Sequence, residues 1–98
     1  MRTDHMYPFT VAENDVAHIQ PRTDSGGEIE LQAIEGAAVF LFKGTLDKDE
    51  AKAAAKDNFH LAAAIGQSAV CKLEDSIGPV TVFSKKASTG FVRSIIEC

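Results

Sequence analysis

The chain has 98 residues, of which 45% are hydrophobic and 24% are charged, and its net charge is −4. This length is enough for one domain with a core, and the composition is typical of a folded protein and not of a disordered one. The longest apolar run, residues 37–42, is far shorter than the roughly 18 residues that a membrane helix needs. We therefore expect a single domain over residues 1–98 that spans no membrane.

The N-terminus and the cysteines indicate the cellular compartment. Residues 1–6 include a basic residue but no apolar segment follows, so no signal peptide is predicted. Cys71 and Cys98 are the only cysteines, which is too few for a disulfide-rich secreted domain and lacks the spacing of a zinc site. We interpret both as thiols and expect a cytoplasmic protein that holds no metal and no cofactor.

The first half of the chain predicts several strands. Residues 7–12 and 16–20 are short apolar segments, and Pro8 and Pro21 favour edge positions for them. Residues 28–33 alternate acidic or amide side chains with apolar ones, which is typical of a strand with one wet face. After a turn at Glu35 and Gly36, the apolar run 37–42 predicts a central strand.

An Ala-rich helix is predicted over residues 47–65. Asp47 and Glu50 have the spacing of a capping box at its start, and Gly66 is a suitable stop. Apolar residues then recur every three or four positions, while Lys52, Lys56 and His60 share another face.

The last third predicts three more strands. Residues 68–73 form one, and residues 80–84 and 91–97 form two more, joined as a hairpin by the basic loop 85–90. With short connections throughout, the expected fold is α+β: an antiparallel sheet of four to five strands with the single helix packed on one face.

Two short stretches match known signatures but lack their context. Asp24-Ser25-Gly26 matches the aspartic-protease signature, yet polar residues 21–23 precede it where that family has an apolar strand. Residues 48–55 resemble the second helix of double-stranded RNA-binding domains, yet Asp49 replaces the second Lys of the phosphate-binding pair. Neither match predicts an enzyme or an RNA-binding protein.

Charge is distributed unevenly along the chain. Residues 1–35 hold seven acids against Arg2 and Arg22, a net charge of −5, whereas the remainder has a net charge of +1. Acidic surfaces repel nucleic acid and attract basic proteins. The candidate contacts are four acidic residues and a basic loop beside Arg93: Asp24, Glu28, Glu30, Glu35, Lys85 and Lys86.

These observations predict a protein-binding module without enzymatic activity. We expect a small acidic inhibitor of a host nucleic-acid-handling machine, of the phage counter-defence or anti-CRISPR class, whose partner has a basic nucleic-acid-binding surface. No direct contact with nucleic acid or membrane is expected. One alternative is a small enzyme or ligand binder with a site between helix and sheet, built from residues such as His18, Asp24 and Arg93. Another is a homo-oligomeric structural subunit, a homodimer included, that pairs through an edge strand.

Overall fold

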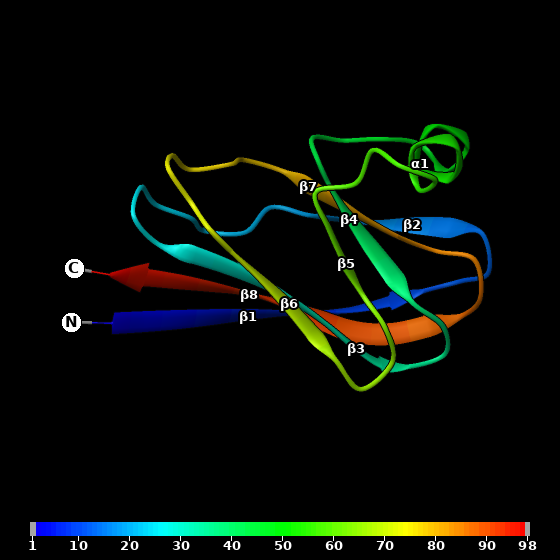
Figure 1. Cartoon of the computed structure of the whole chain (residues 1–98), viewed down its shortest axis with the longest axis horizontal. Helices are drawn as coiled ribbons and strands as arrows, with labels where there is room; N and C mark the ends of the chain where they lie inside the picture. The colour runs from blue at the N-terminus through cyan, green and yellow to red at the C-terminus, as the bar shows by residue number, and fades with distance from the viewer. Residues whose placement is uncertain (1, 98) are drawn as a thin grey trace.

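Two antiparallel four-stranded sheets face each other in the computed structural model, which describes residues 2–97 (Figure 1). Sheet A has the order β1-β8-β3-β6, and sheet B has the order β2-β7-β4-β5. All connections but the one from β4 to β5 cross between the sheets, which is the arrangement of a jelly roll. The strands are β1 (Arg2–Val11), β2 (Asp15–Ile19), β3 (Glu28–Glu35), β4 (Val39–Lys43), β5 (Leu61–Ala63), β6 (Ser68–Lys72), β7 (Val80–Ser84) and β8 (Ser88–Glu97).

The predicted α+β fold is therefore wrong. The described residues form eight strands and not four to five, and they form two sheets and not one. The predicted hairpin over residues 80–97 is also wrong, because β7 belongs to sheet B and β8 to sheet A. Only residues 85–87 form the connection, which crosses between the sheets, because residues 88–90 already belong to β8.

Most of the predicted strands are confirmed. Residues 80–84 coincide with β7, and residues 28–33 lie within β3. The apolar run 37–42 largely becomes β4, which lies between β7 and β5 and is central as expected. The two N-terminal segments become β1 and β2, each at the edge of its sheet.

The helix α1 (Lys48–Ala54) is much shorter than the prediction over residues 47–65. Its capping box is confirmed: the Glu50 backbone N donates to Asp47 Oδ1 at 2.8 Å, and the Asp47 backbone N donates to Glu50 Oε1 at 3.2 Å. After the helix ends, the backbone N of His60 donates to the Leu41 carbonyl at 2.8 Å, which brings the chain onto β4. Residues 61–63 then pair with β4 as β5, and Gly66 (φ 77°) lies in the β5–β6 turn.

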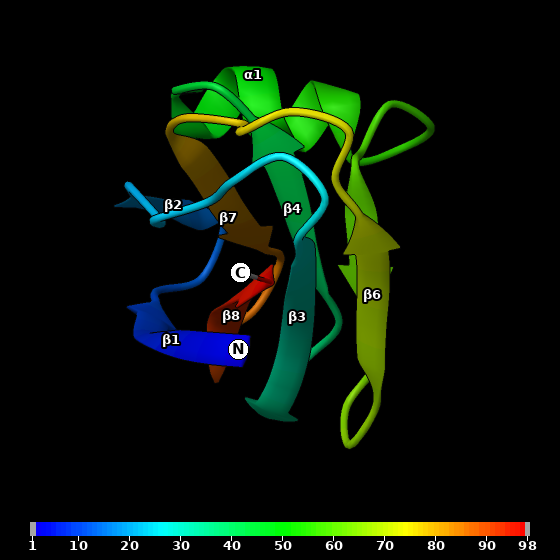
Figure 2. The ribbon, with the colours of Figure 1, turned by 90° about the vertical axis from the view of Figure 1, so that its left-hand side faces the viewer.

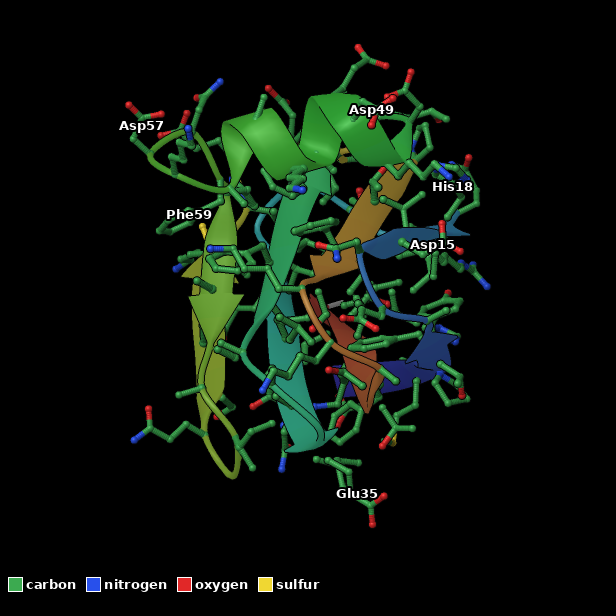
Figure 3. All side chains as sticks on the ribbon, turned by 90° about the vertical axis from the view of Figure 1, so that its right-hand side faces the viewer. Asp15, His18, Glu35, Asp49, Asp57 and Phe59 are labelled. Carbon is green, nitrogen blue, oxygen red and sulfur yellow. The ribbon has the colours of Figure 1, made fainter. Side chains whose placement is uncertain are left out.

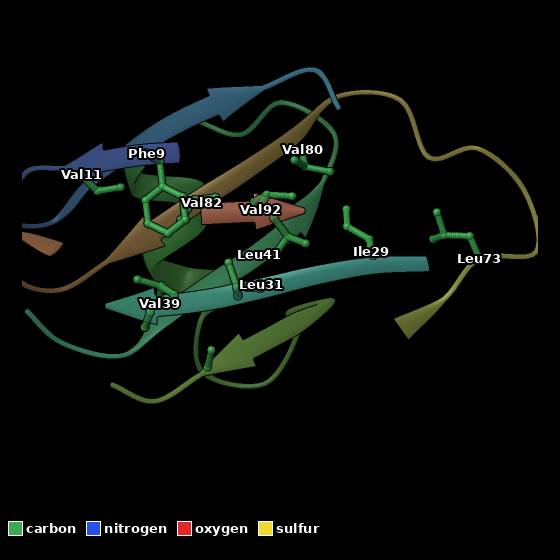
Figure 4. Close-up of a cluster of buried hydrophobic side chains, with 12 residues drawn as sticks. Phe9, Val11, Ile29, Leu31, Val39, Leu41, Leu73, Val80, Val82 and Val92 are labelled. Carbon is green, nitrogen blue, oxygen red and sulfur yellow. The ribbon is translucent and has the colours of Figure 1, made fainter. Parts of the chain in front are cut away.

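The core lies between the two sheets (Figure 4). Inward-facing side chains from both sheets are fully buried there, among them Ile29, Leu31, Val39, Leu41, Val80, Val82 and Val92. A second apolar cluster lies on the outer face of sheet B, where Ala51 and Ala55 of α1 pack with Phe42 and Phe83. The one helix of residues 2–97 thus covers sheet B, on the side away from sheet A (Figure 2).

No helix among the described residues has the length and apolar character needed to cross a membrane. The cytoplasmic location stays a prediction. Cys71 is a free, half-buried thiol, whereas Cys98 lies outside the described residues.

Candidate functional site

The outer face of sheet A carries a row of side chains that crosses all four strands. Antiparallel register aligns Met6 on β1, Arg93 on β8, Glu30 on β3 and Val70 on β6. Cross-strand neighbours on one face of a sheet lie close enough for their side chains to interact. The row therefore places an ionic pair at its centre and an apolar side chain at each end.

Glu30 and Arg93 form the central pair, with Arg93 Nη2 2.6 Å from Glu30 Oε1. The Glu30 side chain is 10% exposed and the Arg93 side chain 31% exposed. Neither Glu30 Oε1 nor Arg93 Nε has a hydrogen-bond partner among residues 2–97. An ion pair that is largely buried and incompletely hydrogen-bonded loses much of its stabilising effect to desolvation.

Large apolar side chains are exposed on the same sheet. Met6 on β1, Ile34 on β3 and Val70 on β6 are 56%, 51% and 50% exposed. Single exposed apolar residues are ordinary, but their concentration on one sheet is typical of an interaction surface. This sheet is also the one that α1 leaves uncovered.

The strand β6 is an edge with free backbone groups. The bonds Leu73 N to Gly27 O (2.8 Å) and Ala33 N to Gln67 O (3.4 Å) flank its pairing with β3. Because hydrogen-bonded and non-bonded positions alternate in an antiparallel pair, Ala69 and Cys71 bond to β3. The backbone N–H and C=O groups of Ser68, Val70 and Lys72 therefore point out of the sheet, where the Lys72 carbonyl accepts from the Cys71 thiol at 3.4 Å.

The other three edges are less suited to accept a further strand. β1 contains Pro8, which lacks a backbone N–H, and β5 has only three residues. β2 has five residues, as β6 does, but its Val16 backbone N already donates to Asp15 Oδ1 at 2.8 Å. Proline, shortness and exposed charge are the features that protect natural edge strands. β6 contains no proline, and its one charged residue is the terminal Lys72.

The predicted contact residues do not form one surface. Asp24 and Glu28 lie at the end of the sandwich where the Ser25 hydroxyl donates to the Glu74 carbonyl at 2.7 Å. Glu35 lies about 23 Å from Glu28 along β3, at about 3.3 Å per residue. It projects on the side away from α1 (Figure 3).

The exposed Lys85 and Lys86 belong to the loop near Glu35, since Ala37 N donates to Ser88 Oγ at 3.0 Å there. Arg93, which the sequence grouped with these lysines, pairs with Glu30 instead. Whether any of these residues binds a partner stays a prediction.

The three residues suggested for an enzyme site are not brought together. His18 Nε2 lies 2.7 Å from the Leu46 carbonyl oxygen, beside α1 on sheet B (Figure 3). Arg93 lies on the outer face of sheet A, and Asp24 lies in the loop between β2 and β3. Among residues 2–97, no three His, Cys, Asp or Glu side chains gather so as to hold a metal ion.

Sequence reasoning did not single out Met6, Ile34 or Val70. A signal was present for Val70, because alternation in 68–72 places it on the same face as Ser68 and Lys72. An apolar residue between two polar ones on a wet face indicates an interaction surface. Met6 gave no such signal, since the face of sheet A on which its side chain lies depends on the register of β1 with β8.

Comparison with known proteins gives a likeness of fold only. No protein-family model and no curated protein matches the sequence. Among the solved chains that match, one covers 97% of this chain and 84% of its own length, with a TM-score of 0.57 and 17% sequence identity. The description of that chain reads "Bacillus endospore appendages form a novel family of disulfide-linked pili". The match supports the sandwich fold of this chain.

Proposed function

We propose that this protein is a structural subunit that assembles with copies of itself through the free edge of β6. The observation that carries the proposal is the unprotected edge, where Val70 directs both its backbone groups and a half-exposed side chain to solvent. A strand from a second copy would satisfy these backbone groups and extend sheet A.

The fold likeness to a chain of disulfide-linked pili supports this function over an inhibitor. The inhibitor hypothesis stays a prediction. Glu30 is one of the acidic contacts that this hypothesis needs, but it pairs with Arg93 of the same chain. The structural subunit was one of the alternatives open from the sequence.

The position of β6 allows two kinds of assembly. β6 and β5 lie at one side of the sandwich, and β1 and β2 lie at the opposite side. If β6 of one copy joins the opposite side of the next, the contact is head-to-tail and leaves both ends free for more copies. If β6 pairs with β6, the contact is closed and stops at a dimer.

The test replaces Val70 by proline. Val70→Pro removes the N–H that faces solvent but keeps the bonds from Ala69 and Cys71 to β3, so the variant is expected to fold. Val70→Thr is the matched control, because it keeps the N–H and the β-branched shape. Light scattering after size-exclusion chromatography, with and without a thiol reductant, measures the number of copies, and electron microscopy shows whether fibres form.

We expect the wild type and Val70→Thr to form oligomers whose mass rises with concentration, and Val70→Pro to stay monomeric with an unchanged circular dichroism spectrum. A wild-type chain that is monomeric at all concentrations would overturn the proposal. Equal assembly of Val70→Pro would also overturn it, since the β6 edge would then not be the contact.

A further inference from the structure

A hollow of about 520 Å³ lies between α1, the end of β4 and the chain that leaves the helix. This volume falls in the range of small-molecule sites, about 300–1,000 Å³. A second hollow, of about 450 Å³, lies toward the β6–β7 loop, and both are lined by Lys43 and His60. These two side chains therefore stand where the hollows meet.

The lining of the first hollow is half apolar and half polar, the polar residues being Lys43, Glu50, Asn58 and His60. The apolar half consists of Phe42, Leu46, Ala54 and Phe59. Phe59 is 42% exposed although its ring lies 5.5 Å from that of Phe40, centroid to centroid. An exposed phenyl group that lines a hollow offers a flat apolar surface to a bound molecule. Figure 3 shows Phe59 at the side of the molecule, just beyond the end of the helix.

Two donor groups of the hollow, on His60 and Lys43, have no acceptor among the described residues. His60 Nε2 is buried and has no hydrogen-bond partner among residues 2–97. A buried polar atom without a partner costs free energy, which a ligand atom in contact with it would recover. Lys43 is exposed and makes no ion pair with another described residue. A ligand oxygen with negative charge would satisfy both donors.

The acidic residues nearby limit the charge of such a ligand. Glu50 lines the same hollow, and its Oε1 is held by the backbone N of Asp47 at 3.2 Å. Glu74 and Asp75 line the second hollow. Their carboxylates repel a dianion such as a phosphate monoester more strongly than a monoanion.

We propose that this hollow binds a small monocarboxylate with an apolar or aromatic body. Its carboxylate accepts hydrogen bonds from Lys43 Nζ and from the Nε2–H tautomer of His60. Its body packs on Phe42 and Phe59. The site lies at the end of β4, so binding does not require assembly through β6.

The test is a titration followed by NMR of the ¹⁵N-labelled chain. The probes are benzoate, phenylacetate, 3-phenylpropionate, isovalerate and hexanoate, each compared with its primary amide. We expect at least one carboxylate to shift the backbone signals of Phe59 and His60 with a Kd of about 1 mM or tighter. The amide, which lacks the charge, should bind at least about tenfold more weakly.

Variants then separate this site from unspecific anion binding. Lys43→Met and His60→Phe should each weaken the carboxylate by about tenfold or more. Lys85→Met, in an exposed loop, and Val70→Pro should bind as the wild type does. If no carboxylate shifts these signals, the proposal is wrong. Equal binding by the acid and its amide would overturn it as well, and so would equal binding by the wild type and Lys43→Met. The comparison of acid with amide uses the wild type alone, so it stays valid even if a variant fails to fold.

Discussion

Arg93 on β8 holds its Nη2 atom 2.6 Å from Oε1 of Glu30, its register partner on β3. The pair is unequally exposed, because Glu30 is nearly covered while about a third of the Arg93 side chain reaches water. Removal of either partner therefore leaves a different residue unpaired. A buried carboxylate without a cation is more costly than a half-exposed guanidinium without an anion.

Arg93→Met is expected to lower the free energy of unfolding by about 2 kcal/mol, and Glu30→Gln by about 1 kcal/mol. The double variant Glu30→Met/Arg93→Met should be more stable than Arg93→Met alone, since no buried charge remains. Urea denaturation of the three variants measures these differences. A double variant no more stable than Arg93→Met would contradict the explanation.

His60 makes stability depend on pH. Burial, and then the charge of Lys43, lower the pKa of His60 below its ordinary value of 6.5. The folded state therefore favours neutral His60. The stability that this preference contributes is fully present above pH 6.5 and is lost as the pH falls through the lower folded pKa. As the pH falls over this range, the free energy of unfolding of the wild type should fall relative to that of His60→Gln, as urea denaturation at each pH measures.

The charge of Lys43 provides a separate check on His60. In Lys43→Met, NMR titration should give a higher pKa for His60 than in the wild type, still below the ordinary value because burial remains. Lys85→Met is the matched control and should leave the titration unchanged. A His60 titration that is identical in Lys43→Met would show that Lys43 does not act on the imidazole.

Ala51 determines how closely α1 approaches sheet B. It is fully buried and packs with Phe42 and Phe83, so Ala51→Leu should lower the free energy of unfolding by about 1–3 kcal/mol through overpacking. Ala53→Leu, on the exposed side of the same helix, should change it by no more than about 0.5 kcal/mol. Thermal and urea denaturation compare the two. Equal free energies of unfolding of Ala51→Leu and Ala53→Leu would mean that the helix does not pack tightly on the sheet.

Local patterns predicted strands better than they predicted the fold. Alternation and apolar runs located β3, β4, β6 and β7, because these patterns reflect burial of one or both faces of a strand. They do not say which sheet a strand joins. The segment 85–90 has the composition of a hairpin loop, yet residues 85–87 connect opposite sheets and residues 88–90 belong to β8, since the partners of β7 and β8 are set by distant residues.

The helix was overextended for a different reason. Alanine favours helix over strand, so residues 61–63 fitted the helical pattern. In the structure, pairing with β4 outweighs this preference, and Ala63 becomes part of the core. The start of the helix was predicted correctly because capping depends only on Asp47 and Glu50, which are neighbours in sequence.

The candidate surface was the hardest part to predict. Glu30 and Arg93 were assigned to opposite charged clusters, because 63 positions separate them and only the β3–β8 register makes them partners. The free edge of β6 depends likewise on its position in the strand order. Both features follow from topology, which no local pattern encodes.

The place of β8 between β1 and β3 has a consequence for synthesis. β1 leaves the ribosome before the other seven strands, and its partner β8 leaves after them (Figure 1). Until residues 88–97 emerge, β1 has no neighbour in sheet A and β3 pairs only with β6. Contacts between such distant segments form slowly and leave apolar strands open to aggregation meanwhile. The nascent chain therefore depends on delayed folding, and chaperones that hold extended apolar segments should bind it before β8 is complete.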